Sequence, residues 1–393
     1  MKNQASKRII GMDLHPDVFT VAAFEGSDPV NAKKLWVKDR VPVSKIEQWA
    51  KKTLTACDIV LMEASGNSFA IASKLHKLGF KAVVLDANTV GRTSKALCSD
   101  DKESAVRIAR VYMTGLCNEV WTPDSESQTM REIFFGYRNA AKERTRFTNR
   151  IKCFLNGIGI RLRKGMRLTK SDAYEKTLTQ GDFTEERKML LKNYFLQLWA
   201  AEGIRKQYDN IMLTKVTGDK VLREMLKIYG VSYKIIYAFK AMIGDVGRFP
   251  NAKKLVSYVG LSPRKVQSGN DAKGNERGVG RRCRNDLRTL FAESAQVIMR
   301  NRNNPWHKWA WQIMARRGHK HIAIIAVARK IAIQVWYGLT GKSHYVVKDK
   351  GFIQRKMKDI ANGIEVEKVI ERGFGTRTEY ALFLENLLLV QHT

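Results

Sequence analysis

Two short apolar runs separated by a helical segment constrain the fold of this chain more than any other feature. Asp58–Met62 (DIVLM) and Lys81–Leu85 (KAVVL) are continuous apolar runs, which is typical of strands buried within a sheet. Between them, Gly66–Leu78 carries apolar residues at helical spacing. This alternation of strand and helix predicts an α/β domain with a buried sheet.

The segments around this unit extend the same domain. Arg8–Leu14 and Phe19–Phe24 read as two strands that can form a hairpin, with a turn at His15–Asp17. Val43–Leu54 and Ser99–Met113 read as helices, and either Ser99 or Asp100 is a suitable N-cap for the second. We therefore expect an α/β domain over residues 1–123.

The remainder of the chain predicts mainly helices. Residues 124–218 contain few Gly and Pro and have apolar residues at helical spacing, which predicts a long helical hairpin or coiled coil suited to dimerisation. Residues 219–342 form a third unit, and residues 343–393 are a polar tail to which the sequence assigns no role. The helices expected in the third unit cover residues 221–229, 233–243, 252–259, 286–300 and 321–339.

The net charge of the chain indicates which class of molecule it binds. The chain has 70 Lys and Arg against 38 Asp and Glu, a formal net charge of +32. Residues 1–120 contribute +5 of this charge and residues 121–393 contribute +27. A chain this basic with 44% hydrophobic residues is a folded protein whose usual counterpart is nucleic acid.

Other features exclude some classes of protein. The most apolar stretch, His321–Ala328, is followed by Arg329 and Lys330, so we expect no membrane span. The N-terminus has no signal-peptide pattern. The five cysteines are far apart and form no CxxC pair, which argues against a zinc site or a disulfide framework and favours the cytoplasm.

Three carboxylates stand where a cation site can form. Asp13 lies within an apolar strand, where an unpaired carboxylate is costly, and Glu63 ends the next buried strand. Asp101 begins a helix. Acids from two strand ends and one helix can hold Mg²⁺ or Mn²⁺ for phosphodiester chemistry. His15 shares the strand face of Asp13, where it can either tune the site or simply pack.

A glycine-rich basic loop surrounds one serine. Residues 261–290 hold eight Lys and Arg and three acids, and the glycines around Ser268 allow close approach to a phosphate. On composition alone, a loop that contacts phosphate is favoured over one in which Ser268 is a nucleophile. The residues expected to bind nucleic acid are Arg264, Lys265, Lys273, Arg277, Arg281, Arg282 and Arg284.

An ordered set of motifs resembles a known family. The segments GMDLH, MEASG, DKESA, IGDVGRFPNAKKLVSYVGLSPRKVQSG, NDLRTLFAESA and HKHIAIIAVARK occur in this order over residues 8–340. Together they resemble the insertion-sequence one-ten family of bacterial transposases, whose C-terminal part is the IS116/IS902-like transposase domain. The resemblance implies an RNase H-like (RuvC-like) N-terminal domain, a helical C-terminal transposase domain, and recombination of DNA guided by a bridge RNA.

The resemblance also assigns roles to individual residues. Asp13, Glu63 and Asp101 match the first three acids of the family's DEDD set, which hold the metal. The fourth acid position carries Ser104, a much weaker cation ligand, so occupancy by a second metal is in doubt. Ser268 matches the nucleophile that forms a covalent bond with a DNA phosphate.

Three functions remain open from these observations. The leading one is a transposase that cleaves and rejoins DNA through a phosphoserine intermediate, with DNA ends and target, a guide RNA and a homodimer or tetramer as partners. The second is a RuvC-type nuclease that uses metal-activated water. The third is a nucleic-acid-binding protein without catalysis.

Overall fold

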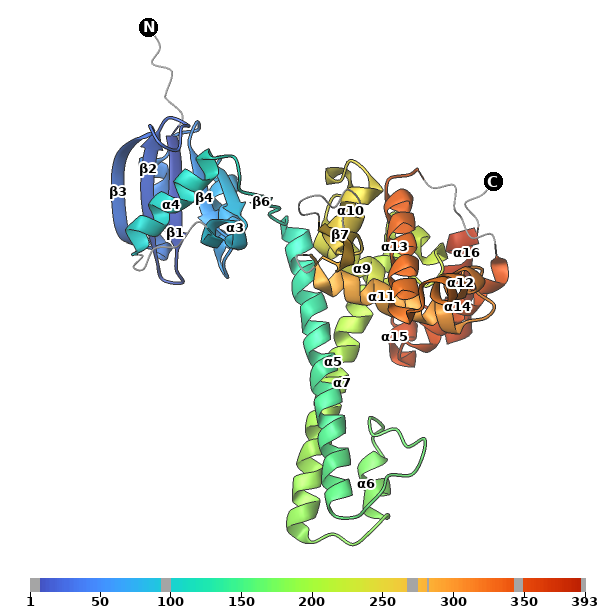
Figure 1. Cartoon of the computed structure of the whole chain (residues 1–393). Helices are drawn as coiled ribbons and strands as arrows, with labels where there is room; N and C mark the ends of the chain where they lie inside the picture. The colour runs from blue at the N-terminus through green and yellow to red at the C-terminus, as the bar shows by residue number, and fades with distance from the viewer. Residues whose placement is uncertain (1–7, 93–99, 267–274, 281–282, 343–348, 390–393) are drawn as a thin grey trace. The chain divides into compact units, whose positions relative to one another are not determined.

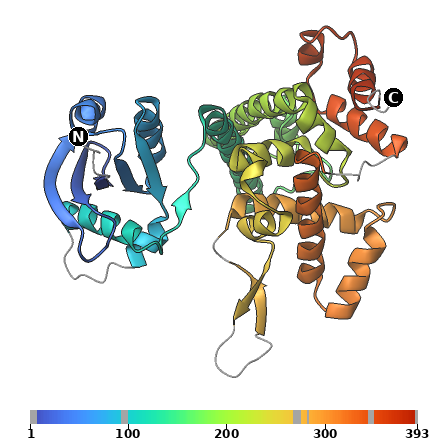
Figure 2. The same cartoon turned by 90° about the horizontal axis from the view of Figure 1, so that it is seen from above.

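The computed structural model describes residues 8–92, 100–266, 275–280, 283–342 and 349–389. The chain divides into two compact units, residues 1–125 and 126–393. Figures 1 and 2 show both, and each unit is described by itself below.

Unit 1 is built on a six-stranded mixed sheet with the strand order β3-β2-β1-β4-β5-β6. β1 pairs antiparallel with β2 and parallel with β4, β4 pairs parallel with β5, and β2–β3 and β5–β6 are antiparallel. The elements are β1 (Arg8–Leu14), β2 (Val18–Glu25), β3 (Lys33–Pro42), a 3-10 turn (Val43–Lys45), α1 (Ile46–Thr53), β4 (Ile59–Glu63), α2 (Ser68–Lys77), β5 (Lys81–Leu85), α3 (Ala87–Arg92), α4 (Asp101–Met113) and β6 (Glu119–Val120).

Apolar side chains of the sheet form a core on each of its faces. On one face Ile10 and Val60 pack with residues of α1 and α2, such as Trp49 and Ile71. On the other face, residues of β1 and β4 pack with α4, which crosses the strands in Figure 1. Burial on both sides is the reason that β4 and β5 read as continuous apolar runs.

The predicted strands and helices of unit 1 are present, and the α/β class is confirmed. Asp100 is the N-cap of α4, and its carboxylate accepts a hydrogen bond from the Glu103 backbone N–H at 2.7 Å. The sequence did not predict β3. This edge strand is mostly exposed and its sequence (KKLWVKDRVP) is rich in lysine, so it lacks the apolar signature of a buried strand.

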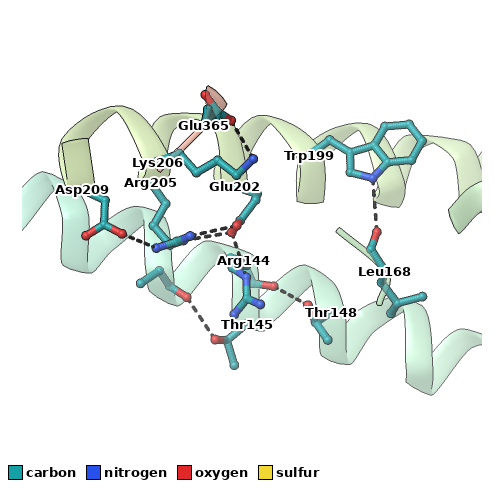
Figure 3. A network of polar contacts seen from close by, with 11 residues as sticks. Arg144, Thr145, Thr148, Leu168, Trp199, Glu202, Arg205, Lys206, Asp209 and Glu365 are labelled. Carbon is teal, nitrogen blue, oxygen red and sulfur yellow. Dashed lines mark hydrogen bonds and ion pairs between the residues drawn. The ribbon is translucent and has the colours of Figure 1, made fainter. Parts of the chain in front are cut away.

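Unit 2 begins with two long helices that lie side by side, α5 (Ser125–Gly157) and α7 (Glu185–Gly218). The short helix α6 (Ala173–Leu178) lies in the connection between them. A small core at the far end of this hairpin includes Phe147, Ile151 and Phe195. Nearer the rest of the unit, ion pairs join the two helices (Figure 3): Arg144 Nε lies 2.9 Å from Glu202 Oε2. The long helices predicted for this region are thus present.

The rest of unit 2 is a helical domain with one β-hairpin. Its large core joins apolar residues from α5 to the last helix of the chain. The elements are α8 (Lys220–Glu224), a 3-10 turn (Met225–Lys227), α9 (Tyr233–Ile243), a 3-10 turn (Val246–Arg248), α10 (Ala252–Val259), β7 (Pro263–Val266), β8 (Asn275–Val279), α11 (Asn285–Arg300), α12 (His307–Arg317), α13 (Lys320–Leu339), α14 (Lys350–Asn362), α15 (Val366–Ile370) and α16 (Arg377–Leu389).

The C-terminal segment of this domain differs from the sequence expectation. The segment expected to be a polar tail contains α14, α15 and α16, whose Met357, Val369 and Leu384 are buried in the large core. Within the described residues, α13 is the one helix long and apolar enough, by length and composition, to cross a membrane. Nine of its residues are buried in the protein, and the core helix of a globular domain passes the same test.

Candidate functional site

The ends of two parallel strands place two acids at the same edge of the sheet. Met12 of β1 is in register with Met62 of β4, and Asp13 and Glu63 each follow by one residue. Asp101 is the first residue of α4, which packs against β1. Three segments far apart in the sequence therefore bring their acids to this end of unit 1.

A glycine sets the distance between β1 and α4. A Cβ atom added to Gly11 would lie 2.0 Å from the Ala105 carbonyl oxygen and 2.9 Å from the Ala109 backbone nitrogen. Only a residue without a side chain fits there, because both contacts are with backbone atoms. This close approach brings the start of α4 near the end of β1, where Asp13 lies.

His15 lies between two of the acids. Its Nε2 atom is 3.3 Å from Asp101 Oδ1 and 3.7 Å from Asp13 Oδ2. Potential ligand atoms of these three residues all lie within 4.8 Å of one another, close enough to hold one metal ion. Glu63 is not part of this group of atoms, although it lies near enough to Asp13 for their charges to interact.

Asp13 and Glu63 resist ionisation, because the pKa of each carboxyl is raised. Burial raises the pKa of Asp13, and the negative charge of Asp101 raises it further, while His15 and Arg107 act in the opposite direction. Burial also raises the pKa of Glu63, with smaller contributions from Asp13 and Asp86. Carboxylates held together at such a cost are typical of a site that receives a cation.

Arg107 is a part of this site that sequence reasoning missed. It lies one helical turn after Ser104, and its Nη2 donates a hydrogen bond to Ser104 Oγ at 3.1 Å. Its positive charge acts on both Asp13 and Glu63. The position at which the resemblance predicts a fourth acid thus carries a hydroxyl that accepts a hydrogen bond from a guanidinium. The sequence did contain a signal for this pair: Ser104 and Arg107 are three residues apart on α4, so their side chains lie on the same face of the helix.

Asp86 is a second residue that the sequence analysis did not single out. It directly follows β5, the parallel neighbour of β4, at the same end of the sheet as Glu63. Burial alone would raise the pKa of Asp86, but hydrogen bonds from Thr89 and Asn88 hold it below its ordinary value. Because its carboxylate already accepts these hydrogen bonds, Asp86 caps the start of α3 and is less suited than Asp13 to bind a cation.

Two paired strands of unit 2, β7 and β8, lie within the predicted nucleic-acid-binding loop. β7 and β8 pair antiparallel, with Arg264 opposite Arg277 and Lys265 opposite Glu276; Figure 2 shows the hairpin clearly. Ser268 and Lys273, and also Arg281 and Arg282, lie outside the described residues. Because the acids and Ser268 belong to different units, their meeting at one phosphate stays a prediction.

Arg284 is the predicted nucleic-acid-binding residue whose side chain the structure describes. It is the N-cap residue of α11, and its backbone N–H donates to the Tyr258 carbonyl oxygen at 3.1 Å. Its Nη2 lies 2.8 Å from Asp286 Oδ2. The chain that leaves the β7–β8 hairpin is thus fixed to the end of α10.

Comparison with known proteins identifies the family. A family profile described as "Transposase IS116/IS110/IS902 family" matches residues 222–312. The chain is 23% identical over 342 residues to the transposase for insertion sequence element IS1111A of Coxiella burnetii, covering 86% of this chain and 91% of that protein. It is also 23% identical over 283 residues to the transposase for insertion sequence element IS1328 of Yersinia enterocolitica, covering 71% of this chain and 82% of that protein. Together these matches support an IS110-family transposase of insertion sequences.

Proposed function

We propose that this transposase is a DNA recombinase in which the acids of unit 1 and Ser268 of unit 2 act on one phosphodiester. The observation that carries the proposal is the cluster of Asp13, Asp101 and His15 at the end of the sheet, beside Glu63. Its support from unit 2 is the match of residues 222–312 to the family profile, which includes the serine segment.

We further propose that unit 1 is an RNase H-like (RuvC-like) domain. The sheet order β3-β2-β1-β4-β5, with β1, β4 and β5 parallel, supports this proposal. Asp13, Glu63 and Asp101 would hold Mg²⁺ or Mn²⁺, because carboxylate oxygens are preferred ligands of both ions. A bound cation would supply Lewis acidity to a phosphodiester oxygen.

The serine step conserves the energy of the broken bond. Ser268 Oγ forms an ester bond to phosphorus, and the bond from phosphorus to the leaving deoxyribose oxygen breaks. The serine proton passes to a base, and the leaving oxygen takes up a proton. A deoxyribose hydroxyl of another strand then attacks the phosphoserine, which restores the serine and rejoins DNA without ATP.

Two variants test this assignment. Wild-type protein incubated with labelled element-end DNA and Mn²⁺ should yield a covalent adduct on a denaturing gel, and Ser268→Ala should yield none. Asp13→Asn should lose the adduct as well as strand breakage. Strand breaks without any adduct would instead indicate a nuclease that uses activated water. If the DNA is not broken at all, the protein binds nucleic acid without catalysis.

The large positive charge of residues 121–393 supports nucleic-acid partners for unit 2. We propose element-end and target DNA, together with a guide RNA that sets target choice, in the cytoplasm. Sequencing the nucleic acid that copurifies with the protein tests the RNA partner. A defined transcript from beside the gene is the expected result, and random cellular RNA would contradict it.

The hairpin helix α7 supports the proposal of a dimer or tetramer. Met189, Leu196, Ile204 and Ile211 recur at intervals of seven or eight residues and are each about half exposed. Residues between them on the exposed face, such as Asn193 and Gln207, carry no charge. Such a stripe is typical of a coiled-coil seam. The double variant Leu196→Glu, Ile204→Glu should have the molar mass of a monomer when measured by light scattering. A molar mass equal to that of the wild-type protein would exclude this seam.

A further inference from the structure

A groove lies between β3, the edge strand of the sheet in unit 1, and α4, which crosses the face of that sheet (Figure 1). Its volume is about 590 Å³. Cations line it from both elements, one from β3 and three from α4, and an acid of α4 lies among them. The cations are Lys34, Lys102, Arg107 and Arg110, and the acid is Glu103. We call this feature the α4 groove.

Positive charge is concentrated in the α4 groove. Residues 1–120 contribute only +5 to the net charge of the chain, whereas four cations and one acid are found among the described residues that line this groove. Within the described part of the chain, the side chains of Lys34 and Arg110 form no ion pair or hydrogen bond. Lys102 lies 3.4 Å from Asp39, but both side chains are exposed, and such a pair contributes little to stability. A phosphate can therefore bind here without breaking a strong interaction.

Valine side chains lie beside these cations. Val37 of β3 and Val106 and Val111 of α4 line the groove, and all three pack in the core on that face of the sheet. Deoxyribose can contact valine without losing a hydrogen bond. The 2′-hydroxyl of RNA would lose its hydrogen bonds to water against such a surface, and a hydroxyl left without a partner is costly. The combination of cations and valines thus favours a DNA strand over an RNA strand.

The α4 groove is continuous with the acid site of unit 1. Lys102 directly follows the acid that begins α4. Arg107 lines the groove, and its positive charge also acts on Asp13 and Glu63. Arg110 lies eight residues after Lys102 on the same helix, which is about 12 Å further along its axis. Since a strand of a DNA duplex rises about 3.4 Å per nucleotide, the groove has the length of a few nucleotides.

We infer that the α4 groove binds one strand of the DNA on which the acids of unit 1 act. This inference rests on the proposed function, and it adds a DNA-binding surface to the unit whose net charge is small. Lys34, Lys102 and Arg110 contact phosphates of the strand, and the valines contact its deoxyribose. Because these are contacts with the backbone, the groove positions the strand beside the acids without reading its sequence.

The alternative is that these cations only keep the protein soluble. Lysine on an edge strand prevents pairing with another sheet, which explains Lys34 but not Arg110 of α4. The experiment therefore changes Lys34 and Arg110 together, and leaves Arg107 unchanged because it belongs to the acid site. Lys74 and Lys77 are the matched control for loss of two charges, since both are exposed on α2, which packs on the opposite face of the sheet.

The test is photocrosslinking, because it reports binding at the groove apart from binding by unit 2. The photoreactive residue p-benzoylphenylalanine replaces Glu103, which is exposed and lines the groove, or Glu47, which is exposed in the first turn of α1 and serves as the control. Full-length protein is irradiated with a labelled DNA oligonucleotide, or with RNA of the same sequence, without a divalent cation. Position 103 should crosslink to DNA about fivefold more than position 47 does, and about fivefold more than to RNA, the effect of one unpaired hydroxyl.

The charge variants test the contacts with phosphate. Lys34→Gln with Arg110→Gln should lower the yield of the DNA crosslink at position 103 about tenfold, as expected for loss of charge-assisted hydrogen bonds. Lys74→Gln with Lys77→Gln should lower it less than about twofold, because distant exposed charges are screened by salt. Equal losses in the two double variants would overturn the inference.

A crosslink at position 103 no stronger than that at position 47 would also overturn the inference, and so would RNA that crosslinks as strongly as DNA. This comparison keeps all four groove cations, so it remains decisive if a charge variant fails to fold. The adduct assay on Ser268 is separate. An adduct without a crosslink at position 103 would reject the groove alone, and a crosslink without an adduct would reject the serine step alone.

Discussion

Gly11 of β1 and Ala105 of α4 approach so closely that a single added carbon would lie 2.0 Å from the Ala105 carbonyl oxygen. The contact joins the strand that carries Asp13 to the helix that begins with Asp101. The separation of these two acids therefore depends on a residue that touches neither.

Gly11→Ala should consequently damage the cation site without altering any ligand. The added carbon forces α4 away from β1, and overpacking of this kind costs about 1–3 kcal/mol. Urea denaturation measures the loss of stability, and electron paramagnetic resonance of added Mn²⁺ measures the weaker binding. Gly91→Ala is the control, since a Cβ there meets no atom within 4 Å. Wild-type Mn²⁺ affinity in Gly11→Ala would contradict the role of this contact.

Restoring an acid at position 104 should have little effect by itself. Arg107 Nη2 already donates to Ser104 Oγ, so a carboxylate in its place would pair with Arg107 and not with a cation. We expect Ser104→Asp to change Mn²⁺ affinity less than about threefold, and Ser104→Asp with Arg107→Gln to raise it about tenfold or more. Calorimetric titration of the four combinations measures the coupling. Equal gains with and without Arg107 would disprove it.

Cation binding should strengthen as pH rises. The pKa values of Asp13 and Glu63 are raised, chiefly by burial. The metal-free fold is thus favoured while these groups are protonated, and it loses that stability as pH rises from their ordinary pKa through the raised one. A cation needs the ionised forms, so the increase in Tm on adding Mn²⁺ should grow over the same range. Asp13→Asn should melt higher than metal-free wild type at neutral pH, yet gain little from Mn²⁺.

Two neighbouring cations on the hairpin should differ sharply in importance (Figure 3). Arg205 bonds Glu202 at 2.9 Å and Asp209 at 3.1 Å, and all three are largely buried. Arg205→Met removes the cation that bridges two acids, although Glu202 keeps Arg144 and Asp209 keeps Lys234, and should cost about 2–3 kcal/mol. Lys206→Met removes a half-exposed pair with Glu365 and should cost less than about 1 kcal/mol. Urea denaturation followed by circular dichroism compares them, and equal losses would contradict this ranking.

Lys356 should make the stability of unit 2 depend on pH above neutrality. The residue is partly exposed, but its ammonium group is buried and donates to the Leu226 and Ile228 carbonyl oxygens. Burial lowers the pKa of Lys356 to about 7. The unfolded chain keeps this proton up to its ordinary pKa, so stability should rise with pH between the two values. Lys356→Met should remove that rise in denaturation curves, while Lys358→Met, on the exposed face, should keep it.

The sequence predicts helices and strands well where they are buried on both faces or on one face only. β4 and β5 are buried on both faces and α10 has one apolar face, so their patterns are distinct. β3 was missed because an edge strand exposes most of its side chains. The β7–β8 hairpin was read as a loop because its residues are glycine-rich and charged, and α14 was missed because its exposed residues are polar or charged.

The candidate site was readable only in part. Asp13, Glu63 and Asp101 could be named because acids after apolar strands and at a helix start are conspicuous. The roles of Gly11 and Arg107 depend on how α4 lies across β1, and no local pattern encodes that contact.

The burial of Met357, Val369 and Leu384 in the large core has a consequence for synthesis of the protein. The ribosome releases α9 and α13 before α14–α16, yet the large core that they share is complete only when α14–α16 are also present. A chain that lacks these helices would leave apolar side chains of the large core exposed and would become a substrate for proteases.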